Sequence, residues 1–368
     1  MSVNYLNNRD LIKNILLSKA SYTWYIDGSF KETKYLNYDI IVCGTQEVFD
    51  EAKNKFTLQR INARRREKDL NKVYKITDAH YKILSEEDIK EIEGKIVLFN
   101  GELTPELEHK AKVGHYNRLR YEEGKKRNYN LDEIQEELDN IDKEDLVIRV
   151  YTFEHIPPDN TRKKVKKKIA DGYMELNFQP YKHYGYYNGK FQCVAISHLD
   201  EDGNINIRHG RINHQLACAF IELCRRYSSR YNWRGYSYVN DMVGQAQLQL
   251  SLVGLQFNEL FSSNPFSYYT SAIKNAFTVI FNEEKKSQET RDKILMANNQ
   301  SPSWTKQLEQ ELSRDEHWDT ILDNNNMAAS TDDLGEANMV EDFDDLDIDD
   351  IDSDGIDDIE DEIQYNKH

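Results

Sequence analysis

The stretch that decides the fold is YNWRGYSYVNDMVGQAQLQLSLVGLQFNELFSSNPFSYYTSAIKNAF, residues 231–277. Apolar residues recur in it every three or four positions, which is the period of an amphipathic helix. Asn264 and Pro265 give the second helix a clear start, with Asn as the N-cap and Pro at the first helical position. The stretch therefore predicts two helices. Their apolar stripes are Val239, Met242, Ala246, Leu250, Val253 and Phe257, and then Tyr269, Ala272 or Ile273, Ala276, Phe277 and Ile280.

A third apolar stripe precedes this stretch and completes a helical domain over residues 210–290. It consists of Ile212, Leu216, Phe220, Leu223 and Tyr227. Further upstream, residues 172–209 predict a β-hairpin region around Asn188-Gly189, because this dipeptide favours two-residue turns. Residues 1–20 predict an N-terminal helix with Asn7 or Asn8 as its cap.

The remaining segments have weaker patterns. Residues 21–153 alternate apolar runs with charged helical stretches and predict an α+β module of unknown role. Residues 154–171 predict a basic linker, and residues 291–330 a linker with a short helix near 304–314. Residues 331–368 predict a disordered acidic tail. The expected fold class is thus mainly α, with a small α+β and hairpin region before the helical domain.

The formal net charge of −17 over 368 residues is concentrated in that tail, which carries 17 Asp or Glu and one Lys. The rest of the chain is nearly neutral, with basic clusters around residues 60–68 and 162–168 that are most often solvated faces. No apolar run is long enough to cross a membrane, and the N-terminus lacks the apolar core of a signal peptide. With four cysteines in a chain of this length, a cytosolic protein without a disulfide scaffold is expected.

Several short motifs in 231–277 match one family pattern in register. An acid opens the first helix and Phe-Asn ends it, an Asn-Pro-aromatic-x-Tyr block follows, and Asn-Ala-Phe closes the second helix. These residues are Asp241, Phe257, Asn258, Asn264, Pro265, Phe266, Tyr268, Asn275, Ala276 and Phe277. Together with NYLNNRDLI near the N-terminus, they resemble region 2 of bacterial sigma factors, in particular the late-transcription sigma factors of T-even-type bacteriophages. Ser271 and Ala272 replace the paired tryptophans of housekeeping sigma factors, and residues 22–170 have no counterpart in the phage family.

The resemblance implies a role for each matched helix. The first helix would dock on the core of the host RNA polymerase through Asp241, Gln245, Leu248 and Gln249. The second would open a TATA-like late promoter. Phe266, Tyr268 and Tyr269 would stack on unpaired bases, while Lys274, Lys285 and Lys286 would contact phosphate. In related phages the C-terminus binds the DNA sliding clamp, a contact that Met339, Val340, Phe343 and Leu346 would make here.

The resemblance thus predicts a non-enzymatic late-transcription sigma factor in the cytoplasm of an infected bacterial host. Its partners would be RNA polymerase core, promoter DNA, the sliding clamp and a late co-activator, with no membrane and no cofactor. Two other functions stay open. One is a nucleic-acid-binding module that never contacts polymerase, and the other is a metal-dependent nuclease. The nuclease would use His209, His214, Cys218 and Cys224, although the Cys-x5-Cys spacing fits no zinc motif and no metal is expected.

Residues in these motifs also have ordinary structural interpretations. Tyr268 and Tyr269 project about 100° apart on a helix, so at most one of them is expected in the core. The glutamines at 245, 247 and 249 are also compatible with the polar side of any amphipathic helix. A calcium-loop pattern at 350–361 follows from the abundance of Asp in the tail.

Overall fold

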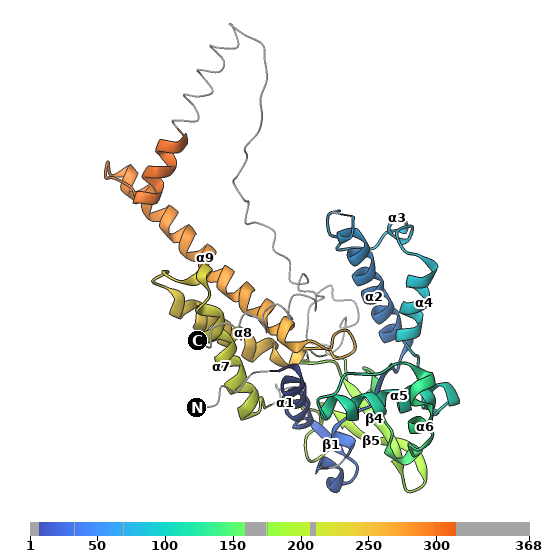
Figure 1. Ribbon diagram of the computed structural model, residues 1–368. Helices are drawn as coiled ribbons and strands as arrows, with labels where there is room; N and C mark the ends of the chain where they lie inside the picture. The colour runs from blue at the N-terminus through green and yellow to red at the C-terminus, as the bar shows by residue number, and fades with distance from the viewer. Residues whose placement is uncertain are drawn as a thin grey trace, which may run out of the picture. The chain divides into compact units, whose positions relative to one another are not determined.

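The computed structural model describes residues 7–32, 34–68, 70–158, 174, 176–206 and 211–313. Within these residues the protein is mainly helical and contains one five-stranded sheet (Figure 1), which confirms the expected fold class at this level. The acidic tail predicted at 331–368 and most of the basic linker predicted at 154–171 lie outside the described residues. Among the helices described, none is long and apolar enough to cross a membrane.

The helices and strands have the following bounds. The α-helices are α1 (Asn8–Ala20), α2 (Gln46–Arg66), α3 (Asp78–Tyr81), α4 (Glu86–Lys95), α5 (Pro105–Glu122), α6 (Leu131–Asp139), α7 (His214–Ser228), α8 (Val239–Val253) and α9 (Pro265–Ala297). Residues 304–313 are also helical. The strands are β1 (Thr23–Tyr25), β2 (Ile40–Cys43), β3 (Val147–Tyr151), β4 (Tyr181–Tyr187) and β5 (Lys190–Ser197). Short 3₁₀ turns are η1 (Gly28–Glu32), η2 (Lys34–Leu36), η3 (Lys143–Asp145), η4 (Tyr231–Trp233) and η5 (Gly254–Gln256).

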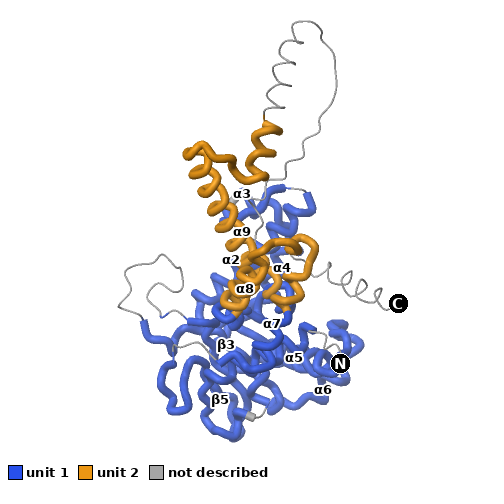
Figure 2. Tube along the Cα trace, turned by 90° about the vertical axis from the view of Figure 1, so that its left-hand side faces the viewer, with its two compact units in different colours: residues 1–222, 251–268 blue, residues 223–250, 269–368 orange. Residues whose placement is uncertain are grey.

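The chain divides into two compact units (Figure 2). Unit 1 comprises residues 1–222 and 251–268, and it contains the sheet and helices α1 to α6. Unit 2 comprises residues 223–250 and 269–368, and its described part is helical. We expected a single helical domain over 210–290, whereas the starts of α7 and α9 belong to unit 1. The reason lies in side-chain contacts between these starts and α1, described below.

The sheet in unit 1 has the strand order β1-β5-β4-β3-β2, with β2 parallel to β3 and the other neighbours antiparallel. It joins strands from two regions that we expected to be separate, 21–153 and 172–209. The hairpin at Asn188-Gly189 is present, with positive φ at both residues as this type of turn requires. A two-stranded hairpin buries too little apolar surface to be stable alone, so it completes a larger sheet.

Strand β3 lies between β4 and β2 and is the most completely buried strand of the sheet, because all five of its residues are buried. On one face Ile148 and Val150 pack in a core with apolar residues of β2 and α5. On the other face Val147 packs with Tyr25, Phe30, Tyr35, Val194 and Ala195. Arg149 shares this second face, and a buried arginine in an interior strand needs a specific set of partners.

A buried carboxylate supplies the main partner. Glu259 follows α8 and η5, and its side chain is buried. The Lys19 ammonium donates to both carboxylate oxygens, at 2.8 and 2.9 Å, and to the Phe257 carbonyl at 2.7 Å. Arg149 Nη1 lies 3.8 Å from Glu259 Oε1, and the Tyr151 hydroxyl donates to Oε2 at 3.2 Å. Burial alone would raise the pKa of Glu259, but Lys19 and Arg149 outweigh it and hold the pKa below its ordinary value.

The guanidinium of Arg149 also contacts two aromatic rings. Its central carbon lies 4.1 Å from the ring centres of both Tyr38 and Tyr181, a cation–π arrangement in a desolvated site. Its Nε–H donates to His183 Nε2 at 2.9 Å, so His183 donates its Nδ1–H to the Tyr35 carbonyl at 2.8 Å. Burial and the Arg149 charge hold the pKa of His183 well below its ordinary value. The imidazole is therefore neutral in the folded protein.

We predict that Glu259→Gln lowers the free energy of unfolding by about 3–5 kcal/mol, because it leaves the charges of Lys19 and Arg149 buried without a counter-charge. Urea denaturation measures the change. The matched control is Glu201→Gln, which removes an exposed partner of Lys31 and is expected to change stability by less than about 1 kcal/mol. Equal effects of the two variants would contradict the structural role of Glu259.

Stability is also expected to fall on mild acidification. His183 and His198 are fully buried, and burial, with the neighbouring His155 and Lys19, lowers the pKa of His198 to about 3. Both histidines take up a proton only in the unfolded chain, at its ordinary pKa near about 6.5. The contribution of the two neutral histidines to the free energy of unfolding is thus complete above that pH and is lost progressively below it. Between pH 7 and pH 5 each histidine lowers the free energy of unfolding by about 2 kcal/mol.

Urea denaturation midpoints across this pH range test the prediction. The exposed His109→Gln variant should keep the wild-type profile. A profile that stays flat from pH 7 to pH 5 would contradict neutral, buried imidazoles at 183 and 198.

Candidate nucleic-acid and polymerase interface

The residues predicted to bind polymerase lie on one side of α8. This helix turns Met242, Ala246 and Leu250 into the core. With about 100° between successive residues, Asp241, Gln245 and Leu248 fall within one arc of about 60° that points away from these buried residues, while Gln249 lies beside Met242. Asp241 is exposed, Leu248 is 54% exposed, and Gln245 and Gln249 are partly exposed. A leucine exposed among polar residues is available for contact with a protein partner.

Helix α1 fixes the start of α7. Asn213 caps α7 by accepting from the Leu216 N–H at 2.7 Å. The cap residue is in turn bound to α1, because its N–H donates to Ser18 Oγ at 3.0 Å and its side-chain amide donates to Asn14 Oδ1 at 3.0 Å. These bonds lie within unit 1. The sequence predicted α1 but not this role. The signal it offers is that polar residues, Asn14 and Ser18, lie on the same side of the helix as the apolar Leu11 and Ile15.

Helix α1 also fixes the start of α9. Asn264 caps the helix by accepting from the Ser267 N–H at 3.0 Å, which confirms the predicted N-cap. The N–H of Phe266, which lies in the first turn of the helix, donates to Asn8 Oδ1 at 3.0 Å. Lys19 of the same helix binds Glu259 in the segment between α8 and α9. The aromatic block predicted to contact unpaired bases therefore begins from a backbone held at two points.

Tyr268 is partly exposed and is held by the last residue of α8 and by the segment that follows it. Its hydroxyl donates to the Val253 carbonyl at 3.2 Å, and its ring meets Phe257 nearly edge-on at 5.7 Å between centres. Burial raises the pKa of Tyr268 to about 12, so the phenol is neutral and remains a donor. Phe266 is partly exposed as well. Both residues are thus partly accessible at the surface.

Tyr269 does not fit its predicted role, because its side chain is 0% exposed. A ring that stacks on a base needs an open face. On α9, Tyr269 instead lies on the buried side with Ile273 and Phe277. The rotation of about 100° between neighbours puts Tyr268 toward the surface and Tyr269 into the core. The structure thus selects the core interpretation that the sequence left open for Tyr269.

The lysines predicted to contact phosphate do not form one stripe. Lys274 and Lys285 are separated by about three helical turns and so share a side of α9, whereas Lys286 lies about 100° further round. Lys285 and Lys286 are exposed, and Lys274 is partly buried. The helix also continues to Ala297, past the linker boundary expected at 291. Asp292 explains the extension, since it accepts at 2.7 Å from both the N–H and the hydroxyl of Ser303, ahead of the helix at 304–313.

The residues of the nuclease alternative are dispersed. His214 and Cys218 are neighbours on α7, with Nε2 and Sγ 3.6 Å apart, and Cys218 is exposed. Cys224 is buried, and burial raises the pKa of its thiol to about 11. His209 lies outside the described residues. Within the described part of the chain, no three His, Cys, Asp or Glu side chains are grouped to hold a metal ion.

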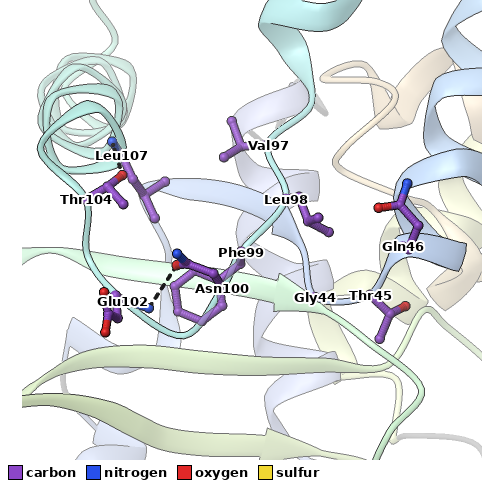
Figure 3. A pocket seen from close by; sticks show the side chains of 10 residues that line it. All are labelled: Gly44, Thr45, Gln46, Val97, Leu98, Phe99, Asn100, Glu102, Thr104 and Leu107. Carbon is purple, nitrogen blue, oxygen red and sulfur yellow. Dashed lines mark hydrogen bonds between the residues drawn. The ribbon is translucent and has the colours of Figure 1, made fainter.

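Unit 1 also contains a pocket of about 240 Å³ (Figure 3). It opens between the starts of two helices, where Thr45 caps α2 and Thr104 caps α5. Phe99, Asn100 and Glu102 complete a lining of mixed polarity. None of the residues predicted to bind polymerase or DNA lines this pocket. The predicted clamp-binding residues Met339, Val340, Phe343 and Leu346 lie outside the described residues.

The different environments of the two adjacent tyrosines lead to a prediction. Tyr269→Ala should lower the free energy of unfolding by about 3–5 kcal/mol, because it empties a large buried site. Tyr268→Ala should lower it by only about 1–2 kcal/mol, since it removes a partly exposed ring and one hydrogen bond. Urea denaturation of both variants measures the difference. A larger loss for Tyr268→Ala would contradict the assignment of core and surface.

Comparisons with family models, with curated proteins and with solved structures find no match to this chain.

Proposed function

We propose that the protein is a sigma-type initiation factor for phage late transcription. The observation that carries this proposal is the position of the Asn-Pro-aromatic-x-Tyr block. It opens α9 directly after α8, and Asn264 caps the helix while Asn8 binds the Phe266 N–H. A partly exposed aromatic pair, Phe266 and Tyr268, thus follows a helix whose surface presents Gln245 and Leu248. Region 2 of sigma factors, which the motif resembles, uses two such helices in succession.

In this proposal the two helices have different tasks. The exposed side of α8 docks on the core of the host RNA polymerase through Asp241, Gln245, Leu248 and Gln249. The start of α9 contributes Phe266 and Tyr268 to the melted strand of a TATA-like promoter, where each stacked base is worth about 1–3 kcal/mol. Lys274, Lys285 and Lys286 provide phosphate contacts of the kind that make such binding sensitive to salt.

The acidic C-terminal segment would provide the link to activation. Its apolar residues, Met339, Val340, Phe343 and Leu346, are spaced among carboxylates as in short segments that anchor on a partner protein. In the related phages that partner is the DNA sliding clamp, and we propose the same contact here together with a late co-activator. The protein would act in the cytoplasm of the infected host, without enzymatic activity or a cofactor.

Run-off transcription tests the function directly. Core RNA polymerase is assayed on AT-rich late promoter templates with and without the protein. Specific transcripts that depend on the protein are expected. Binding to DNA without any such transcripts would favour a nucleic-acid-binding module that acts independently of polymerase.

The docking surface gives a sharper prediction. Gln245→Glu with Gln249→Glu adds two charges to the proposed contact without disturbing the buried side of α8, so affinity for core polymerase should fall at least about tenfold, or 1.4 kcal/mol. Co-purification with core polymerase measures the loss. Gln135→Glu with Gln300→Glu adds the same charge at exposed positions of other segments and should bind normally. Equal binding by both double variants would contradict the role of α8.

A further inference from the structure

The last turn of α7 and the residues that join it to α8, called here the α7–α8 connection (residues 225–238), have a composition unlike the rest of the chain. Residues 225–238 contain four arginines, four tyrosines and one tryptophan, and no acidic residue. The chain as a whole has a formal net charge of −17. Arginine mixed with aromatic residues is the composition of surfaces that bind single-stranded nucleic acid. None of the polymerase-binding or DNA-binding residues predicted from the sequence lies in this segment, which belongs entirely to unit 2.

Some of the aromatic rings anchor the segment to α9. The Trp233 ring lies 5.2 Å from Phe277 in an edge-to-face arrangement and 6.2 Å from Tyr227. The Tyr236 ring lies 5.7 Å from Phe281, again edge-to-face. Pairs of this geometry contribute beyond the area that they bury. The segment is therefore a packed part of unit 2, so side chains that it leaves outside hold defined positions.

Contacts within the segment also hold two of its arginines, Arg230 and Arg234. Arg234 donates its Nε–H to the Ser229 carbonyl at 2.9 Å and closes the loop around η4. Gly235, with φ of 97°, provides the turn that follows, a conformation that a residue with a Cβ rarely adopts. The guanidinium carbon of Arg230 lies 4.6 Å from the ring centre of Tyr227. A surface whose cations are ordered before binding loses less entropy when a ligand arrives.

Five of the arginine and aromatic side chains of the segment are exposed. Tyr231 is 89% exposed, and Arg225, Arg226, Arg230 and Arg234 are all exposed. A ring with this much free surface contributes little to the core. In the sequence it lies between Arg230 and Arg234, so a ring for a base and cations for its phosphates are close together along the chain. Glu284 lies near this region, where burial, Tyr236 and Glu284 together raise the pKa of Tyr238.

We propose that the α7–α8 connection is a binding site for single-stranded nucleic acid. Tyr231 stacks on an unpaired base, and Arg230 and Arg234, with Arg225 and Arg226 nearby in the sequence, bind the backbone phosphates. The site needs no polymerase, so it does not depend on the function proposed above. A single strand is favoured over a duplex because a paired base has no free face for Tyr231. An acidic polypeptide would satisfy the arginines but not the exposed ring.

Fluorescence anisotropy with the full chain tests the site. The probes are labelled oligo-deoxythymidine, oligo-uridine, a DNA duplex and an oligo-glutamate peptide, each over a range of salt concentrations. The wild-type chain should bind a single strand more tightly than either the duplex or the peptide. Comparison of the two single strands identifies DNA or RNA as the preferred source. Tighter binding of the peptide would overturn the proposal in favour of a protein partner.

Variants separate the two kinds of contact. Arg230→Ala with Arg234→Ala should weaken single-strand binding at least about tenfold and reduce the salt slope by about 1.4, as expected for two lost phosphate contacts. Tyr231→Ala should weaken it at least about fivefold with an unchanged slope, and Tyr231→Phe should restore binding because it keeps the ring. Unchanged affinity in either alanine variant would overturn the site as proposed.

The control removes the same charge elsewhere. Lys110→Ala with Lys190→Ala eliminates two exposed cations of unit 1 and should bind like the wild type. An equal loss in this variant would show a diffuse electrostatic effect and overturn a localised site. Urea denaturation of the Tyr231 variants and of the lysine control should match the wild type, since these side chains are exposed. A small loss of stability is expected only for Arg230→Ala with Arg234→Ala, because this variant also removes the contacts to Tyr227 and Ser229.

Discussion

The buried carboxylate of Glu259 constrains the architecture of unit 1. An ionised group in the interior is tolerated only when charges and hydrogen bonds replace its water. Lys19 from α1, and Arg149 and Tyr151 from β3, provide that replacement. Glu259, Lys19 and Arg149 are the ionised members of this cluster, and they are far apart in the sequence. Each charge finds its partner only when α1, β3 and the segment between α8 and α9 come together. Apolar packing alone accepts several similar arrangements, whereas this cluster of charges accepts few.

The same helix that supplies Lys19 also prepares the candidate interface. Asn8, Asn14 and Ser18 bind backbone or cap groups at the starts of α9 and α7. The first turn of a helix has N–H groups without partners, and here other elements of unit 1 fill part of that need. Phe266 is consequently placed by a hydrogen bond to its own backbone. A partly exposed aromatic pair held in this way loses little entropy on stacking.

The three proposed contact surfaces differ in chemistry. The outer side of α8 is polar with one exposed leucine, which suits a protein partner. The start of α9 presents two partly exposed rings with lysines further along the same helix. The connection from 225 to 238 concentrates arginine and aromatic residues without acids. Because most of the acidic excess of the chain lies in residues 331–368, the two nucleic-acid surfaces need not compete with a uniformly negative body.

The sequence by itself determined the features that depend on neighbouring residues. Asn264-Pro265 specified the start of α9 and Asn188-Gly189 the hairpin turn, since capping and positive φ are local properties. Helical periodicity also predicted the buried side of α8 and the polar side opposite it. Tertiary structure decided the rest. In the sequence Lys19 and Arg149 resemble ordinary surface charges, and only the fold places Glu259 beside them. Strands from two regions share one sheet because a hairpin alone buries too little apolar surface. Adjacent tyrosines at 268 and 269 could not both be buried, but only the packing of α9 against its neighbours determined which ring lies inside. Long-range contacts of this kind leave no periodic signal, because they join residues whose separation in the sequence carries no information about their distance in space.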